Sequence, residues 1–134
     1  MKINHIGYLV KDIDKAIEQH RMLGYFLDRD VVCDEARGVK LGFMSKEGYT
    51  LEFVEPISES SVAWNLFKRK GAGPYHICYE IDKIGDIEEE LVSRGFVLIN
   101  PPAPALAFGG RRVAFYTHRE IGTIELLETG GDNE

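Results

Sequence analysis

Several features that would mark a specialised chain are scarce in these 134 residues. Only two cysteines occur, Cys33 and Cys78, and they are too few and too far apart for a disulfide framework. No apolar run approaches the roughly 20 residues of a membrane-spanning helix. The first residues, Met1 to His5, enter a strand-like pattern rather than a signal-peptide core. We therefore expect a cytoplasmic protein with reduced thiols and no membrane partner.

Basic residues are also fewer than acidic residues. Lys and Arg number 16 against 22 Asp and Glu, which gives a net charge of −6. No basic surplus is left to neutralise a phosphate backbone, so we expect no nucleic-acid partner. What remains, 44% hydrophobic and 28% charged residues, is typical of one soluble globular domain with its own core.

An internal repeat is the most informative feature of the chain. Asn4–Val10, with the sequence NHIGYLV, aligns with Tyr75–Ile81, YHICYEI, so that His5 falls opposite His76. Near the end of each half, Leu51–Glu55 aligns with Ile124–Glu128 after a small slip, so that Glu52 falls opposite Glu125. Because repeated segments adopt the same local structure, the two halves are predicted to share one arrangement of elements.

That arrangement is β-α-β-β-β, with residues alternating in the strands and recurring at helical spacing in the helices. In the first half we predict strands at Lys2–Val10, Tyr25–Asp34, Arg37–Ser45 and Tyr49–Glu55, and a helix at Asp12–Leu23. In the second half we predict strands at Tyr75–Ile81, Phe96–Asn100, Arg112–Tyr116 and Thr123–Glu128, and a helix at Ile84–Arg94. Asp12 or Asp14 can cap the first helix, and Gly24 and Gly95 are expected to stop the two helices.

We therefore predict a single α+β domain over residues 1–128, with module one at 1–56, a linker helix within 57–72 and module two at 73–128. Val62, Leu66 and Phe67 form the expected inner face of the linker helix. Residues 129–134 form a polar tail that we expect to be frayed. The segment Pro101–Gly110 is an insertion without a counterpart in the first half. We expect it to be extended and to line or cover a pocket; the alternative is a surface loop with Phe108 packed down.

The repeat places a histidine and a glutamate at matching positions of each half, His5 with His76 and Glu52 with Glu125. Each glutamate lies between apolar neighbours in a strand, so it points to one defined face. A buried carboxylate costs several kcal/mol unless it is paired or binds a metal. If the halves pair their sheets about a pseudo-twofold axis, the four side chains meet, and their donors suit a divalent first-row ion. For each residue alone, a structural histidine or a solvent-facing glutamate is the alternative.

Other polar residues give weaker signals. Glu55 and Glu128 also match each other, but each ends its strand, and we expect both to be exposed. His20 and His118 have no repeat partner, and we place His20 at the helix surface or the core edge. The basic run Lys68–Lys70 is expected at a solvated helix end, with anion binding as the alternative.

The motifs together resemble the vicinal oxygen chelate superfamily, also called the glyoxalase/bleomycin-resistance/dioxygenase group. The resemblance covers roughly residues 3–128 and is strongest in HIGYLVKD from His5, GPYHI from Gly73 and GTIELLE from Gly122. It implies two tandem modules that form a cupped antiparallel or mixed sheet around a central metal site. The implied ligands are His5, Glu52, His76 and Glu125. The implied ion is Ni, Co or Zn, with Mg or Mn as further options, and a homodimer is expected.

The resemblance implies a choice between activities. Our leading prediction is glyoxalase I-like (lactoylglutathione lyase-type) isomerisation of a thiol adduct, because Tyr75-His76 departs from the His-His pair usual in epimerases. The first alternative is methylmalonyl-CoA epimerase-like inversion of the carbon beside an acyl thioester, and the segment between Leu51 and Gly73 resembles that subfamily in length. The second alternative is sequestration of a small molecule without chemistry, as in bleomycin-resistance proteins.

Both enzymatic interpretations share one mechanism, in which a metal acts as Lewis acid and a carboxylate moves a proton from carbon. The resemblance makes Glu125 and Glu52 the candidate catalytic bases. Arg111 and Arg112, together with Phe108, are candidate substrate contacts, because an arginine could hold a glutathione carboxylate or a CoA phosphate. Ordinary solvation at a strand end is the alternative for both arginines.

Overall fold

The computed structural model describes residues 1–130 and shows two compact units. The His5 unit comprises His5–Tyr75, and the His76 unit comprises Met1–Asn4 and the chain from His76 onward. Within the His76 unit, the Asn4 side-chain amide donates to Glu80 Oε2 at 2.8 Å. Of the predicted frayed tail, only residues 129 and 130 are described; the remainder lies outside the described residues.

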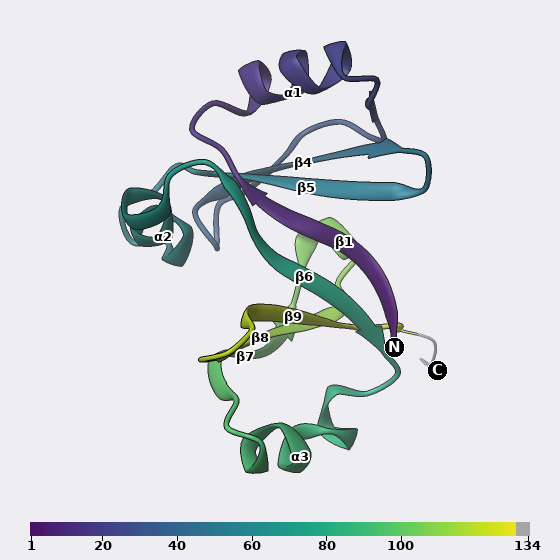
Figure 1. Ribbon diagram of the computed structural model, residues 1–134, viewed down its shortest axis with the longest axis vertical. Coiled ribbons are helices and arrows are strands. Elements are labelled where there is room, and N and C mark those ends of the chain that lie inside the picture. Colours follow the sequence, from purple (N-terminus) through teal and green to yellow (C-terminus); the bar gives the residue numbers. More distant parts are fainter. Residues whose placement is uncertain (131–134) are drawn as a thin grey trace. The chain divides into compact units, whose positions relative to one another are not determined.

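The His5 unit has the predicted β-α-β-β-β order (Figure 1). Its elements are β1 (Lys2–Leu9, which begins in the other unit), α1 (Ile13–Met22), β2 (Phe26–Leu27), β3 (Val32–Asp34), β4 (Val39–Lys46) and β5 (Tyr49–Pro56), followed by α2 (Val62–Lys70). Strand β5 pairs parallel with β1 and antiparallel with β4, while β2 and β3 pair antiparallel with β4. The sheet of this unit is therefore mixed.

The His76 unit repeats the same pattern. Its elements are β6 (Gly73–Ile81, which begins in the other unit), a 3-10 turn η1 (Ile84–Asp86), α3 (Glu88–Ser93), β7 (Val97–Pro104), a 3-10 turn η2 (Leu106–Phe108), β8 (Arg112–His118) and β9 (Gly122–Glu128). Strand β9 pairs parallel with β6 and antiparallel with β8, and β8 pairs antiparallel with β7. The predicted α+β class, with two β-α-β-β-β modules, is confirmed.

The ends of α1 lie where the cap residues predicted them. The Asp12 side chain accepts a hydrogen bond from the Lys15 N–H at 3.2 Å, and Gly24 follows α1 with a φ of 100°. Ser61 caps α2 by accepting from the Trp64 N–H at 3.1 Å. These side chains satisfy N–H groups that have no partner inside the first helical turn.

Two predicted elements are divided in the structure. The predicted strand Tyr25–Asp34 is the two short strands β2 and β3, because the exposed charged run Asp28–Asp30 leaves the sheet between them. The predicted helix Ile84–Arg94 is η1 followed by α3, and Gly85 is a poor helix former inside its first turn.

The prolines after Asn100 are extended, as the sequence predicted, and they lengthen the predicted strand Phe96–Asn100, so that β7 ends at Pro104. Strand β7 is the last in the sheet order of its unit, and an edge strand tolerates residues that cannot donate to a neighbour. Its register with β8 shifts twice, between Leu98 and Asn100 and between Asn100 and Ala103. The rest of the insertion forms η2 and a turn through Gly109 and Gly110.

The predicted inner face of α2 was wrong at Val62, which is 50% exposed, whereas Ala63 is buried. The first turn of this helix packs against the β3–β4 turn, where a Cβ on Gly38 would lie 3.2 Å from the Ser61 Cβ. Leu66 and Phe67 are half-buried. Among residues 1–130 no helix is long and apolar enough to cross a membrane.

Each unit buries a hydrophobic cluster between its first helix and one face of its sheet. In the His5 unit the cluster consists of Val10, Ile13, Ile17, Met44, Leu51 and Phe53; in the His76 unit it consists of Ile84, Leu91, Ala114, Tyr116, Ile124 and Leu126. A fully buried side chain of this size stabilises the fold by about 1.5–3 kcal/mol. Because side chains alternate along a strand, the residues between these core positions occupy the opposite face of each sheet.

A glutamate at the end of the last strand binds the start of the helix in each unit. Glu55 Oε1 accepts from the Ile13 N–H at 2.8 Å, and Glu128 Oε2 accepts from the Ile84 N–H at 3.0 Å. Both glutamates are half-buried, so the expectation that they would be exposed was wrong. Strand-end position alone does not show that a helix N–H lies within reach.

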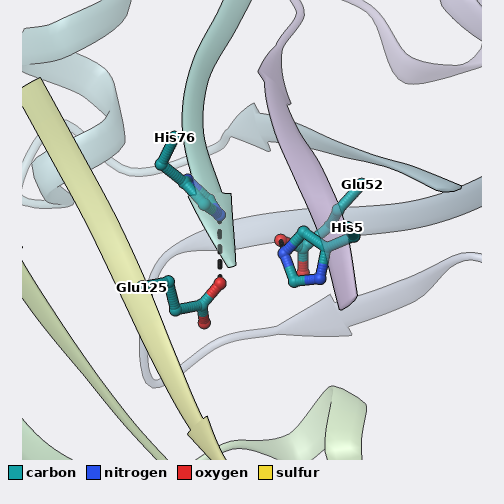
Figure 2. A group of neighbouring side chains, drawn as sticks. All are labelled: His5, Glu52, His76 and Glu125. Atoms are coloured by element: carbon teal, nitrogen blue, oxygen red, sulfur yellow. Dashed lines mark ion pairs between the residues drawn. The ribbon is translucent and has the colours of Figure 1, made fainter. Parts of the chain in front are cut away.

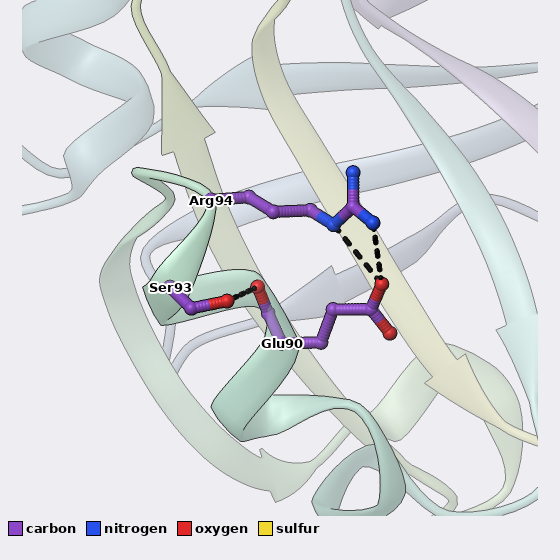
Figure 3. Close-up of polar contacts among 3 residues, drawn as sticks. All are labelled: Glu90, Ser93 and Arg94. Carbon is purple, nitrogen blue, oxygen red and sulfur yellow. Dashed lines mark hydrogen bonds and ion pairs between the residues drawn. The ribbon is translucent and has the colours of Figure 1, made fainter.

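The last turn of α3 is closed by side-chain contacts at the surface (Figure 3). Arg94 Nε and Nη2 lie 3.0 and 2.9 Å from Glu90 Oε2, and the Ser93 hydroxyl donates to the Glu90 carbonyl oxygen at 2.9 Å. An ion pair between side chains this exposed contributes a few tenths of a kcal/mol at most. The attachment of α3 therefore depends on the buried Leu91.

Candidate metal centre

Strand alternation in the His5 unit turns a histidine and a glutamate to the face opposite α1. On β5, Leu51 and Phe53 belong to the core beside α1, so Glu52 between them faces the other way. There His5 Nε2 lies 3.0 Å from Glu52 Oε1, and the two residues are 1% and 5% exposed (Figure 2). Glu52 is thus buried, as its apolar neighbours indicated.

The His76 unit contains the same pair. Ile124 and Leu126 face the helix-side core, which turns Glu125 to the other face of β9. His76 Nε2 lies 3.0 Å from Glu125 Oε1, shown as a dashed line in Figure 2, and the residues are 4% and 3% exposed. Two unrelated surface glutamates would not show this equality of distance and burial.

An aromatic ring stands beside each pair, which the sequence analysis missed. Phe43 is the register partner of Glu52, and its ring meets that of His5 edge-on at 6.0 Å between centroids. Phe115 is the register partner of Glu125, and its ring meets that of His76 edge-on at 5.2 Å. The strand register, rather than the sequence repeat, makes Phe43 and Phe115 equivalent, because each is the partner of its unit's glutamate.

Each pair fits a divalent ion by its chemistry and by its geometry. Two ligands about 2.1 Å from one ion and at right angles to each other are separated by about 3.0 Å, whereas tetrahedral ligands are separated by about 3.4 Å. The observed 3.0 Å between imidazole nitrogen and carboxylate oxygen matches the octahedral value.

Of the predicted substrate contacts, Phe108 lies on the same sheet face as the His76–Glu125 pair. Its side chain packs against the buried cluster of Cys78, Ala105, Val113 and Leu127. Cys78 is the register partner of Glu125, which places this cluster directly beside the carboxylate. The η2 segment therefore covers part of this face with Phe108 packed down onto it, which was the alternative from the sequence. Pro102, Gly109 and Gly110 of the same insertion line a cavity, as the first expectation had it.

The structure does not bring the two arginines to the His76–Glu125 pair. Along β8, Arg112 shares its face with Ala114 and Tyr116, which belong to the helix-side core. Arg111 donates from Nε to the Phe108 carbonyl oxygen and from Nη1 to that of Thr129, each at 3.4 Å. Both arginines line a cavity of about 640 Å³, whose other charged lining residues are Asp82, Lys83, Asp86, Glu88 and Glu128.

The two remaining histidines have structural roles. His20 Nδ1 lies 2.9 Å from the Ala16 carbonyl oxygen, and its ring packs among Tyr8, Tyr25 and Phe53, which confirms its place at the core edge. His118 Nδ1 accepts from the Glu120 N–H at 3.0 Å, so its Nε2 donates to the Arg94 carbonyl oxygen at 2.9 Å.

Comparison with known proteins gives concordant matches over most of the chain. Residues 4–115 match the family described as the glyoxalase/bleomycin resistance protein/dioxygenase superfamily. The sequence is 29% identical over 131 residues to the ethylmalonyl-CoA/methylmalonyl-CoA epimerase of Cereibacter sphaeroides, covering 95% of this chain and 96% of that protein.

Solved structures agree with the sequence matches. A hypothetical protein from Bacillus halodurans superposes with a TM-score of 0.84 at 27% identity, over 99% of this chain and 97% of the other. The methylmalonyl-CoA epimerase of Mycobacterium tuberculosis superposes with a TM-score of 0.78 at 25% identity, over 95% of this chain and 87% of the other.

Proposed function

We propose, from the premise that the chain belongs to the glyoxalase/bleomycin resistance protein/dioxygenase superfamily, that it inverts the carbon beside an acyl-CoA thioester. The observation that best supports this proposal is a buried glutamate in contact with a histidine in each unit, Glu52 and Glu125. The relative from Cereibacter sphaeroides, matched over nearly its whole length, is named as an epimerase. The comparisons thus favour the epimerase alternative, and they support the glyoxalase I-like prediction only at the level of the superfamily.

His5, Glu52, His76 and Glu125 together would hold one divalent ion. Each residue is buried and offers one ligand atom. Two carboxylates balance the charge of a divalent cation, and mixed nitrogen and oxygen donors suit Ni, Co or Zn, with Mg or Mn as further options. When bound, the ion supplies Lewis acidity to the thioester oxygen, which makes the neighbouring C–H more acidic.

Inversion at carbon requires a proton to leave one face and a proton to arrive at the opposite face. A carboxylate from each unit supplies the two bases that this requires, so we assign Glu52 and Glu125 these roles. His5 and His76 orient the carboxylates through their 3.0 Å contacts. The Phe43 and Phe115 rings beside the pairs exclude water, which strengthens the electrostatic interactions of the site.

Arg111 and Arg112 remain proposed contacts for the phosphates of CoA, away from the reacting carbon. Their cavity is lined on the open side by Gly109 and Gly110, where an added Cβ would meet no atom within 4 Å. The double variant Arg111→Ala/Arg112→Ala should raise the KM for an acyl-CoA about tenfold and leave that for the corresponding acyl-pantetheine unchanged. Equal effects on both substrates would rule out a role at the nucleotide end.

The proposed reaction is tested by incubating single-enantiomer methylmalonyl-CoA with the protein in D2O. Loss of optical activity should accompany deuterium incorporation at C2, and Glu52→Gln and Glu125→Gln should each slow inversion at least about a hundredfold. Glu120→Gln, an exposed glutamate away from both pairs, is the matched control.

Two results would count against the proposal. A wild-type protein that isomerises the methylglyoxal–glutathione adduct but leaves methylmalonyl-CoA unchanged would restore the glyoxalase I-like prediction. Full inversion by either glutamine variant would remove that glutamate from the pair of bases.

A further inference from the structure

Strand β7 carries a single polar side chain. Its sequence from Val97 to Pro104 is VLINPPAP, in which only Asn100 is polar. Register shifts on both sides of Asn100 leave this residue as the partner of Phe115 on β8. A residue that precedes a proline is held in the extended region, and irregularities of this kind re-aim side chains in edge strands. The backbone therefore fixes the direction of the Asn100 side chain.

This register places Asn100 on the face of the sheet that carries the His76–Glu125 pair. Phe115 pairs with Glu125 on β9 and with Asn100 on β7, so the three residues form one row across neighbouring strands (Figure 1). Residues that pair in register point to the same face. The row therefore runs from the buried carboxylate, across the Phe115 ring, to the amide of Asn100 at the edge of the sheet.

The Asn100 amide is accessible to a ligand. The residue is half-buried, and within residues 1–130 its side chain makes no hydrogen bond. The adjacent register pair, Val113 and Leu127, is covered by Phe108, which bounds the row on that side. A ligand lying along the row would thus meet an apolar wall, an aromatic ring and, at the outer end, a group that both donates and accepts hydrogen bonds.

The His5 unit has no counterpart to Asn100. There β2 pairs with Met44 and β3 with Leu41, and the chain between β2 and β3 leaves the sheet beside Phe43. Among the described residues, no strand residue pairs with Phe43 on the side away from β5; instead the Arg29 guanidinium stacks on its ring, 4.0 Å from the centroid. The two units therefore offer different groups to the parts of a ligand beyond the reacting carbon.

The length of the row matches the thioester end of an acyl-CoA. Neighbouring strands lie about 4.8 Å apart, so the backbones of Glu125 and Asn100 are about 10 Å apart. In an acyl-CoA, the amide nitrogen nearest to the sulfur is five bonds, or about 6 Å, from the carbon beside the thioester carbonyl. The remainder is about one hydrogen-bond length. An N–H covered by protein needs an acceptor more than a carbonyl needs a donor, and the Asn100 side-chain oxygen is an acceptor.

We propose that Asn100 positions the ligand by accepting a hydrogen bond from the amide N–H nearest to the thioester sulfur. The assignment rests on the proposed function, because it places the acyl carbon at Glu125. The recognised amide belongs to the pantetheine arm that every acyl-CoA shares, so Asn100 selects the carrier and not the acyl group. It takes no part in proton transfer.

The test measures calorimetric binding of propionyl-CoA and of its analogue in which an ester oxygen replaces that amide N–H. The wild type should bind propionyl-CoA about three- to tenfold more tightly than the ester analogue. Asn100→Leu, which keeps the size of the side chain, should remove this preference and change binding of the ester analogue by no more than about twofold. Asn65→Leu, at an exposed asparagine of α2, is the matched control and should keep the preference.

A preference for the amide that survives Asn100→Leu would overturn the assignment, as would a wild type without the preference or an equal loss of both ligands. Unchanged binding of the ester analogue shows that the variant is folded. Epimerisation of methylmalonyl-CoA by the wild type is measured separately. If the wild type epimerises and the preference survives the substitution, only the role of Asn100 fails. If the wild type does not epimerise but Asn100→Leu removes the preference, only the proposed function fails.

Discussion

Beside their buried pairs, the His5 and His76 units keep the same three residue types and differ in what lies next to the aromatic ring. In the His5 unit a guanidinium stacks on Phe43. In the His76 unit the apolar segment carrying Phe108 packs against the cluster that includes Phe115 at its edge. If the proposed chemistry is correct, the repeated residues serve the part of the reaction that is alike on both faces of the substrate carbon. The divergent residues then serve the parts of the substrate that differ.

The largest expected effect comes from breaking one pair while the other stays intact. If the four ligands hold one shared ion, His5→Ala and His76→Ala should each abolish tight binding of nickel, cobalt or zinc to chelator-stripped protein, because each variant loses one of the four ligands and leaves the paired glutamate without its histidine contact. Titration calorimetry should give one ion per wild-type chain, and His118→Ala should match the wild type. Two ions per chain, with one retained in each variant, would show that the units bind metal independently.

A second comparison uses matching glycines in the turns before β4 and β8. Gly38 has a φ of 69°, and a Cβ there would lie 2.8 Å from the Ser58 Cβ; Gly110 has a φ of 87°, and a Cβ there would meet nothing within 4 Å. Gly38→Ala should therefore cost about 2–4 kcal/mol of unfolding free energy, strain plus steric overlap, and Gly110→Ala about 1 kcal/mol. Urea unfolding measures both. Equal costs would mean that the turn before β4 relaxes.

The two strand-end glutamates, Glu55 and Glu128, should also contribute different amounts to the free energy of unfolding. Glu55 shares the start of α1 with the Asp12 cap, whereas within the described residues no side chain caps η1 and Glu128 reaches its first N–H. We expect Glu55→Ala to cost about 1 kcal/mol and Glu128→Ala about 2 kcal/mol. Urea unfolding of both variants and of Glu120→Ala as a control would measure the difference. A larger loss of stability in Glu55→Ala than in Glu128→Ala would show that the Asp12 cap does not compensate for the missing Glu55 side chain.

The smallest expected effect on stability comes from a difference between the hydrophobic clusters of the two units. Met44 and Tyr116 directly follow the matching residues Phe43 and Phe115, and both are fully buried. Within the described residues the Tyr116 hydroxyl has no hydrogen-bond partner. Tyr116→Phe should therefore stabilise the protein by about 1 kcal/mol by removing an unsatisfied polar group. Tyr79→Phe, at a half-buried tyrosine of the same unit, is the control.

The same substitution has a pH dependence with a defined sign. Burial, and secondly the negative charge of Glu88, raise the pKa of Tyr116 above its usual 10.0. The folded state therefore holds this proton more tightly than the unfolded chain. The resulting stability is fully present below pH 10 and is lost as the pH rises through the raised pKa. Urea unfolding at pH 8 and pH 10.5 should show a greater alkaline loss in the wild type than in Tyr116→Phe; an equal loss would contradict the raised pKa.

The repeat made much of this structure predictable. Copies of the segments around His5 and Glu52 predicted the order of elements in both units, and the apolar neighbours of Glu52 and Glu125 predicted their burial. The local sequence pattern did not predict features that depend on tertiary contacts. Ala63 rather than Val62 faces inward because α2 packs on the Gly38 turn, and prolines remain in β7 because it is an edge strand.

The residues around the candidate site were harder to predict than the site itself. Phe43 and Phe115 look like ordinary core residues in alternating strands, and only register places them beside the glutamates. Arg29 is one of many charged residues in a polar segment, and its stacking on Phe43 depends on how Asp28 is attached to β4. Arg112 is a predicted substrate contact because it lies beside Gly109 and Gly110. That it faces the helix side of β8, away from the His76–Glu125 pair, follows from the alternation of the whole strand.

The parallel pairing of β1 with β5 has a consequence for folding during synthesis. Ile6 pairs with Leu51, and the Ile13 N–H is bound by Glu55, so the first strand and the first helix depend on a strand that is synthesised much later. Until β5 leaves the ribosome, β1 and α1 are nascent chain without their sheet partner. Such long loop closures slow folding. We expect a stalled chain ending before Tyr49 to remain accessible to proteases and chaperones, and protection of the His5 unit to arise in one step once β5 has emerged.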